Sequence, residues 1–146
     1  MEGFIFATIG AGLAVGLPAL GSAIGSGIAG ASASGVIAEK KEMFVTGLIF
    51  EALPQTAVIF GFVIAVMIVG GIKEDLSLLA GIKMLGAGIA MGIAGLTPVA
   101  QASVLAAGIG STARAPATKV NNIVYAAIPD LSVIMGFVVA FLLISG

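Results

Sequence analysis

The chain has 146 residues, of which 60% are hydrophobic and 9% are charged, and its formal net charge is −1. A soluble domain usually carries about a quarter charged residues, so this composition excludes a soluble globular protein and indicates an integral membrane protein. No basic surface is available for nucleic acid. The chain contains no Cys and no His, which excludes disulfides and zinc sites built from thiolate or imidazole.

The first apolar stretch runs from residue 3 to residue 38 without a charged side chain. It has no Lys or Arg before its apolar run, unlike a cleaved secretory signal, so we expect a membrane helix that is retained. The segment "GSGIAG" (25–30) matches the G-x-G-x-x-G dinucleotide fingerprint. That fingerprint requires a preceding strand, so these glycines are expected to serve helix packing instead.

Three more apolar spans follow, at roughly 43–72, 84–113 and 120–145, and clusters of charged residues separate them. About 20 apolar residues cross the hydrocarbon core, so each span is predicted to be one long helix that overshoots or tilts. The fold class is therefore an all-α membrane protein with four transmembrane helices. The first and third helices hold most of the 22 glycines, with small residues on every side, which favours a crowded inner position.

The sequence repeats itself at an offset of 75 residues. Matching residues lie in the second and fourth spans: Ala52, Pro54, Ile59, Gly61, Phe62, Val63 and Ala65 recur as Ala127, Pro129, Ile134, Gly136, Phe137, Val138 and Ala140. The chain is thus predicted to be a tandem duplicated helical hairpin, with hairpins at 1–75 and 76–146 forming a single domain. Because each repeat crosses the membrane twice, the two repeats are parallel rather than inverted.

Basic residues predict the orientation. The connections at 39–42 and 114–119 carry four Lys or Arg residues, whereas the opposite side has only Lys73 and Lys83. By the positive-inside rule, both termini are expected on the non-cytoplasmic side.

Four helices place polar groups at a similar depth. By helix rise, Asp130 lies roughly 16 Å from the cytoplasmic end of its helix, and Thr56, Gln101 and Ser26 lie about 20 Å in. These groups are predicted to converge on one layer, with Glu51 near one turn closer to the cytoplasm.

A carboxylate at this depth costs at least ~2.5 kcal/mol when ionised, so such groups tend to be functional. Protonation or a bound cation relieves that cost, which makes Asp130 a candidate carrier of one positive charge. The alternative is a structural acid that bonds a neighbouring helix, and the same two interpretations stand for Gln101, Thr56 and Glu51.

Two prolines affect the backbone near this layer. Pro54 and Pro129 each remove the amide partner of a carbonyl one turn earlier, at Phe50 and Tyr125. In lipid a freed carbonyl needs a donor or an ion, although each proline can also mark a simple kink.

Three segments, "EALPQTAVIFGFVIA" (51–65), "GLTPVAQASVLAAGIGSTARAP" (95–116) and "AAIPDLSVIMGFVVAFLL" (126–143), resemble the proteolipid c or K subunit of V-type and archaeal A-type rotary ATPases. The similarity covers essentially the whole chain. It implies a membrane rotor ring of identical copies that carries H⁺ or Na⁺, with Gly-rich helices inside and Pro-containing helices outside. Asp130 holds the position of the ion-carrying acid, which is more usually Glu, and Gln55 stands at the matching position of the first hairpin.

The resemblance also implies a set of ion ligands. Sodium-carrying members use the acid, a Gln, a backbone carbonyl, a Thr, a second Gln and a Tyr, and the first four correspond to Asp130, Gln101, Leu53 and Thr56. Ala57 and Phe60 replace the second Gln and the Tyr, which favours the proton slightly. Glu51 shares a helix face with Gln55 and is hypothesised to substitute for the missing first-hairpin acid or to add a ligand.

The resemblance implies partners as well. No Arg lies within the apolar spans, so a stator membrane subunit must supply the arginine that discharges Asp130. The loops at 39–42 and 114–119 would seat a central-stalk subunit, and lipid surrounds the ring. No cofactor is expected, and the chain is not an enzyme because it has no phosphate-binding G-x-x-x-x-G-K-[ST] loop. The alternatives are a stand-alone small ion transporter or channel and a structural oligomeric membrane proteolipid.

Overall fold

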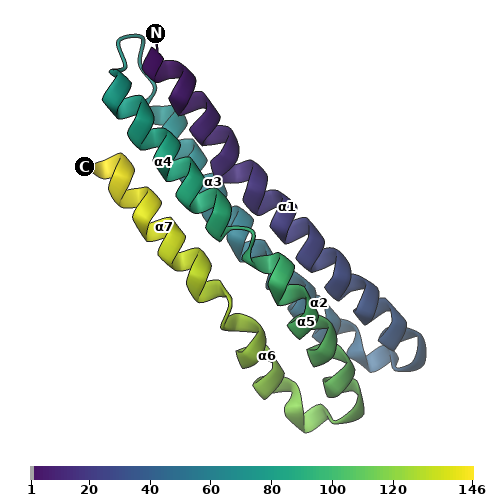
Figure 1. Ribbon diagram of the computed structural model, residues 1–146. Helices are drawn as coiled ribbons and strands as arrows, with labels where there is room; N and C mark the ends of the chain where they lie inside the picture. Colours follow the sequence, from purple (N-terminus) through teal and green to yellow (C-terminus); the bar gives the residue numbers. More distant parts are fainter. Residues whose placement is uncertain (1) are drawn as a thin grey trace.

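The computed structural model describes residues 2–146 and forms a bundle of four long helical segments (Figure 1). These segments run over Glu2–Glu39, Lys41–Gly71, Leu78–Arg114 and Pro116–Ser145, and each is long and apolar enough to cross a membrane. The four predicted spans are therefore confirmed. The two chain ends lie at the same end of the bundle, as an even number of crossings requires.

Only the first segment is one uninterrupted helix, α1 (Glu2–Glu39), which continues through Pro18 and through the glycines of "GSGIAG". The later segments are broken in the middle. In chain order their elements are η1 (Lys41–Met43), α2 (Phe44–Ala52), α3 (Gln55–Gly71), α4 (Leu78–Ala94), α5 (Thr97–Arg114), η2 (Pro116–Thr118), α6 (Lys119–Ala127) and α7 (Asp130–Ser145).

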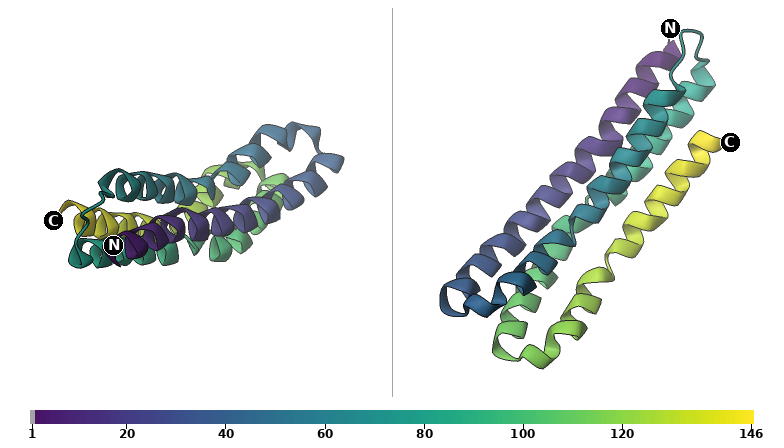
Figure 2. Two further views of the ribbon diagram at one scale, coloured as in Figure 1. Left: turned by 90° about the horizontal axis from the view of Figure 1, so that it is seen from above. Right: turned by 180° about the vertical axis from the view of Figure 1, so that it is seen from behind.

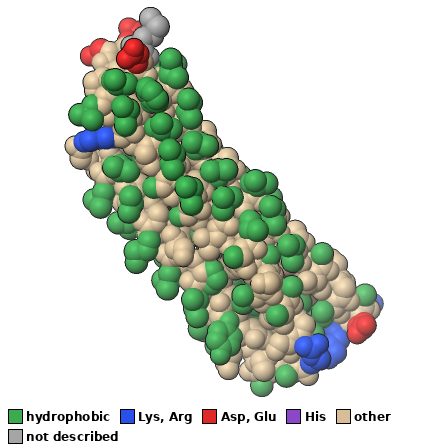
Figure 3. All heavy atoms as spheres, in the orientation of Figure 1, with side chains coloured by type: hydrophobic (Ala, Val, Ile, Leu, Met, Phe, Trp, Pro, Cys, Tyr) green, Lys and Arg blue, Asp and Glu red, His purple; other side chains and the backbone are tan. Residues whose placement is uncertain are grey.

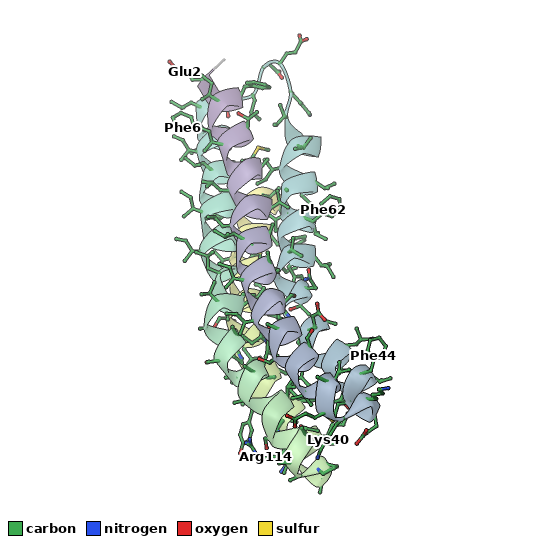
Figure 4. The ribbon with its side chains drawn as sticks, turned by 90° about the vertical axis from the view of Figure 1, so that its right-hand side faces the viewer. Glu2, Phe6, Lys40, Phe44, Phe62 and Arg114 are labelled. Atoms are coloured by element: carbon green, nitrogen blue, oxygen red, sulfur yellow. The ribbon has the colours of Figure 1, made fainter. Side chains whose placement is uncertain are left out.

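Prolines mark the breaks in the second and fourth segments. α2 ends and α3 begins around Pro54, and α6 gives way to α7 around Pro129. A proline lacks the amide hydrogen and its ring pushes on the preceding turn, so the helix cannot continue unchanged. The third segment breaks at Gly95 and Leu96, just before Pro98, and the bundle bends near this level (Figure 4).

The third segment begins earlier than the sequence predicts, at Leu78 instead of residue 84. The Ser77 hydroxyl caps this helix by accepting a hydrogen bond from the Ala80 amide at 3.2 Å. Lys83 then lies within the helix, partly buried. A lysine can bury its stem and extend its ammonium group to the membrane surface, so its charge does not end the span.

Close backbone contacts hold the inner helices together. α1 packs against α4, α5 and α3, while α7 packs on α4 and α3 (Figure 2). A Cβ atom built on Gly88 would collide with the backbone of Gly10, so α1 and α4 touch backbone to backbone. Small residues permit such van der Waals packing in a membrane. The Gly-rich helices α1 and α4 thus pack closely within the chain, and their inner position in a ring stays a prediction.

One side of α1 remains uncovered. Built Cβ atoms on Gly12, Gly16, Gly27 and Gly35 would meet nothing within 4 Å. The small residues of α1 are thus more numerous than the packing within one chain requires.

The surface matches a membrane-spanning bundle. Hydrophobic side chains cover its length, and the charged ones gather near its two ends (Figure 3). Lys40 and Arg114 lie together at the end opposite the termini (Figure 4), where the Lys40 ammonium donates to the Ala113 carbonyl and joins the two hairpins. The predicted division after residue 75 falls in the connection between α3 and α4.

Candidate ion-binding site

Asp130 is the first residue of α7, directly after the Pro129 break. Its side chain is half-buried and accepts a hydrogen bond from Gln101 Nε2 on α5, at 3.2 Å from Oδ1. Thr56 on α3 is the other side chain beside this carboxylate. The structure therefore gathers the predicted acid, amide and hydroxyl from three helices and from both hairpins.

Gln101 is completely buried, at 0% exposure. Its Nε2 also donates to the Ala126 carbonyl at 2.5 Å, whereas its Oε1 has no hydrogen-bond partner among the described residues. Buried polar atoms are almost always satisfied. If the amide turned over, Oε1 would lie beside Asp130 and the Ala126 carbonyl, and three oxygens would converge. A proton or a cation stabilises such a group of acceptors.

The far side of the site is built around the break before α3. The Thr56 hydroxyl donates to the Leu53 carbonyl at 3.1 Å, which keeps both oxygens together. Ala57 is fully buried, and the Phe60 ring packs on Phe137 with their centroids 4.9 Å apart. The two positions that lack a polar side chain are therefore filled by apolar packing.

Glu51 and Gln55 belong to a second polar group, around Ser26 of α1. Gln55 Nε2 donates to the Ser26 hydroxyl at 2.7 Å, and that hydroxyl donates to the Glu51 carbonyl at 3.0 Å. The Glu51 carboxylate lies against Gly30 of α1 and is half-buried. The hydrogen bonds of the described residues do not connect either side chain to Asp130.

The two polar groups are copies of one another at the offset of 75. Gln101 bonds the Ala126 carbonyl as Ser26 bonds the Glu51 carbonyl, and Asp130 corresponds to Gln55. The predicted common layer is therefore present as two separate clusters. Sequence reasoning noticed Ser26 but not that it replaces Gln101 in the repeat, although the offset alone would have revealed this.

The carbonyls that receive side-chain donors are not those that the prolines were predicted to free. The acceptors are Glu51 and Ala126, one residue after Phe50 and Tyr125, and Ser22 bonds the Pro54 carbonyl at 2.7 Å. The proline ring displaces the whole preceding turn, so it opens more carbonyls than the one that loses its amide.

The donor set limits the chemistry of the site. Within residues 2–146 no three His, Cys, Asp or Glu side chains gather into a metal site. A cation at Asp130 would be held by one carboxylate with amide, hydroxyl and carbonyl oxygens, ligands that suit a hard cation. A proton would need only the carboxylate and one acceptor.

Comparison with known proteins locates the chain among its relatives. The model of the ATP synthase C-subunit family matches residues 9–68 and again residues 85–143. The chain is 38% identical over its full length to the A-type ATP synthase subunit K of Methanocaldococcus jannaschii, of which it spans 64%. It is 36% identical over 97% of its length to the V-type sodium ATPase subunit K of Enterococcus hirae, covering 92% of that protein.

A third relative is more distant. The 16 kDa proteolipid of the V-type proton ATPase of Homo sapiens is 29% identical over 94% of this chain and 90% of that protein. The two matches to one family model, in consecutive parts of the chain, agree with the duplicated hairpin. The relatives' names include both sodium and proton.

Proposed function

This chain belongs to the ATP synthase C-subunit family, and we propose that it is a rotor-ring subunit of a V- or A-type rotary ATPase. It carries H⁺ or Na⁺ across the membrane on Asp130 and couples that flux to rotation. The observation that carries the proposal is the geometry at Asp130, a mid-membrane carboxylate that accepts a hydrogen bond from Gln101 and lies beside Thr56, from two other helices. Relatives that are named as subunits of A-type and of V-type ATPases support it.

In the proposed cycle, Asp130 is neutral while it passes lipid, because it holds a proton or a cation. At a stator subunit it meets an arginine, releases its ion into one half-channel and reloads from the other. Each charge carried across the membrane is worth about 2.3 kcal/mol per 100 mV, and the ring adds these steps into torque. ATP chemistry takes place on other subunits.

The site favours the proton. Thr56, the Leu53 carbonyl and the freed Gln101 oxygen would be the ligands of Na⁺ beside Asp130. Sodium-carrying members have two further oxygen ligands, a Gln and a Tyr. The residues at these positions, Ala57 and Phe60, have apolar side chains and supply no oxygen. A proton requires no such cage, so we infer that H⁺ is the transported ion.

The proposed assembly consists of a ring of identical chains in the membrane and a central stalk bound at one end of that ring. Identical copies form the ring within lipid, with both termini on the non-cytoplasmic side. The loops at 39–42 and 114–119, where Lys40 and Arg114 lie together (Figure 4), seat the central stalk.

Labelling with dicyclohexylcarbodiimide, which attacks buried protonated carboxyls, tests the function. We expect mass spectrometry of the detergent-purified protein to find the adduct on Asp130, at a rate that Na⁺ does not change. Suppression by Na⁺ would identify a sodium rotor instead. Absence of labelling on Asp130 would contradict the proposal.

Glu51 and Gln55 are proposed as the first hairpin's counterpart of the ion site. Because Glu51 is a half-buried carboxylate about one turn from the ion layer, Glu51→Gln is expected to alter ion affinity or turnover in the assembled ATPase. Coupled transport identical to that of the unmodified protein would rule out this role.

A further inference from the structure

A groove lies between α5 and α6, on a side of the second hairpin that the chain leaves open. It has a volume of about 600 Å³. Its lining includes Val104, Gly108 and Tyr125. Tyr125 is 62% exposed, and among the described residues its hydroxyl makes no hydrogen bond. A phenol within the membrane segment needs an acceptor for that hydroxyl.

The first hairpin has the same groove, but there it is filled. The counterparts of Val104, Gly108 and Tyr125 at the offset of 75 are Ala29, Ala33 and Phe50. All three are buried, in one cluster with side chains of the second hairpin: Leu105, Ile109 and Ala126. The second hairpin therefore occupies the groove of the first.

The repeat identifies what would fill the open groove. The counterparts of Leu105, Ile109 and Ala126 are Gly30, Ser34 and Glu51. A second copy that packed on the open groove, as the second hairpin packs on the first, would present these three residues to it.

This exchange compensates the change in side-chain volume only in part. Gly30 and Ser34 are smaller than Leu105 and Ile109, whereas Glu51 is larger than Ala126. A Cβ atom built on Gly30 would lie 3.1 Å from Glu51 Oε1, so the carboxylate already occupies the space that the glycine leaves. The long acid thus fills part of the volume that Leu105 fills within the chain.

We propose that Glu51 of one copy accepts a hydrogen bond from the Tyr125 hydroxyl of the neighbouring copy. The corresponding residues within the chain, Ala126 and Phe50, are both fully buried in one apolar cluster. Between copies, a donor and an acceptor replace this apolar pair, and each satisfies a polar group that would be costly in lipid. The inference rests on the proposed ring and gives Glu51 a partner in it.

A second contact follows from the same packing. Within the chain, Phe60 of α3 packs on Phe137 of α7. The repeat counterparts of these two residues, at the offset of 75, are Met135 and Phe62, and the proposed packing brings Met135 of one copy against Phe62 of the next. In the single chain Met135 is 66% exposed and Phe62 is 60% exposed. Figure 4 shows Phe62 pointing away from the bundle. A thioether against an aromatic ring is a favourable contact, so the packing also covers these two exposed side chains.

Cross-linking tests the interface directly, because the natural chain has no Cys. Chains carrying Glu51→Cys and differently tagged chains carrying Tyr125→Cys are co-expressed, and the purified complex is treated with a short bismaleimide. We expect products that contain both tags. The matched control, Phe50→Cys with Ala126→Cys in one chain, should cross-link within the chain and give no larger product.

The outcomes separate this inference from the proposed function. A large complex in which the control pair reacts, but the cysteines introduced at positions 51 and 125 do not, would overturn the Glu51–Tyr125 contact and leave the ring intact. A chain that purifies as a monomer would overturn both. Met135→Cys with Phe62→Cys in one chain provides a second pair, which is expected to give a ladder of linked copies.

Substitutions test the hydrogen bond itself. Tyr125→Phe and Glu51→Ala should each speed dissociation of the assembled complex in detergent by about fivefold, the effect of losing one hydrogen bond. Because both changes remove the same bond, the double variant should dissociate no faster than either single one. Effects that multiply in the double variant would show that the two side chains act independently and would contradict the proposal.

Discussion

Asp130 and Gln55 occupy the same position in the two hairpins, yet only Asp130 can carry a proton or a cation. Each begins the helix after a proline and interacts with one side chain of an inner helix, Gln101 or Ser26. The difference is that an amide–hydroxyl pair satisfies itself, whereas a carboxylate beside an amide leaves the Gln101 Oε1 without a partner among the described residues. The Gln55–Ser26 pair is thus satisfied, whereas the site at Asp130 is proposed to remain able to bind an ion.

Asp130→Asn tests this distinction. The substituted side chain keeps an oxygen that can accept from Gln101, so the fold and the assembly should persist, but it cannot alternate between a charged and a neutral state. We expect ion transport and carbodiimide labelling at this position to be lost, while the size of the purified complex stays unchanged. Retained transport would indicate that another group carries the ion, and an intact cellular role without transport would favour a structural proteolipid.

At the scale of helices, two kinds of residue shape the bundle. Glycines allow α1 and α4 to touch at Gly10 and Gly88, and prolines break the second and fourth segments at the depth of the polar groups. The breaks are what expose the Glu51 and Ala126 carbonyls to donors from the inner helices. Close helix packing and the helix breaks are both needed for these hydrogen bonds. The breaks free the carbonyls, and the donor side chains reach them only because the helices are close.

Gly88→Leu should separate the two inner helices. Its side chain would meet the backbone of Gly10, which cannot move aside as a flexible side chain can. Overpacking of this kind costs about 1–3 kcal/mol, so we expect a lower thermal unfolding midpoint in detergent. Gly70→Leu is the matched control, since nothing lies within 4 Å of a Cβ built there. Equal midpoints for the two variants would contradict the close α1–α4 contact.

The whole molecule has two chemically different ends. Both termini and the α3–α4 connection lie at one end, and the loops with Lys40 and Arg114 lie at the other (Figures 1 and 4). By the positive-inside rule we expect the second end to lie in the cytoplasm.

Single cysteines test this orientation, again because the natural chain has none. In intact cells, a membrane-impermeant maleimide should label Ser77→Cys. Lys41→Cys should become reactive only after the membrane is permeabilised. The reverse pattern would place the termini in the cytoplasm.

Sequence reasoning alone was enough for the membrane class, the number of crossings and the repeat, because hydropathy, charge and a fixed offset are properties of the chain itself. It also selected Asp130, Gln101 and Thr56 as candidate ligands by depth and by resemblance, and the folded chain places the three together. It placed the start of the third helix too late, since a lysine can snorkel, and it did not foresee that the carbonyls of Glu51 and Ala126 receive side-chain donors.

The grouping of the polar residues, in contrast, required the folded bundle. Depth along a helix does not specify which way a side chain faces, so Ser26, Glu51 and Gln55 could not be separated from the Asp130 site until the helices were packed. Likewise, the filled groove of the first hairpin and the open one of the second arise only when two copies of one motif meet in space. Packing joins residues that are distant in sequence, and a local pattern carries no record of that contact.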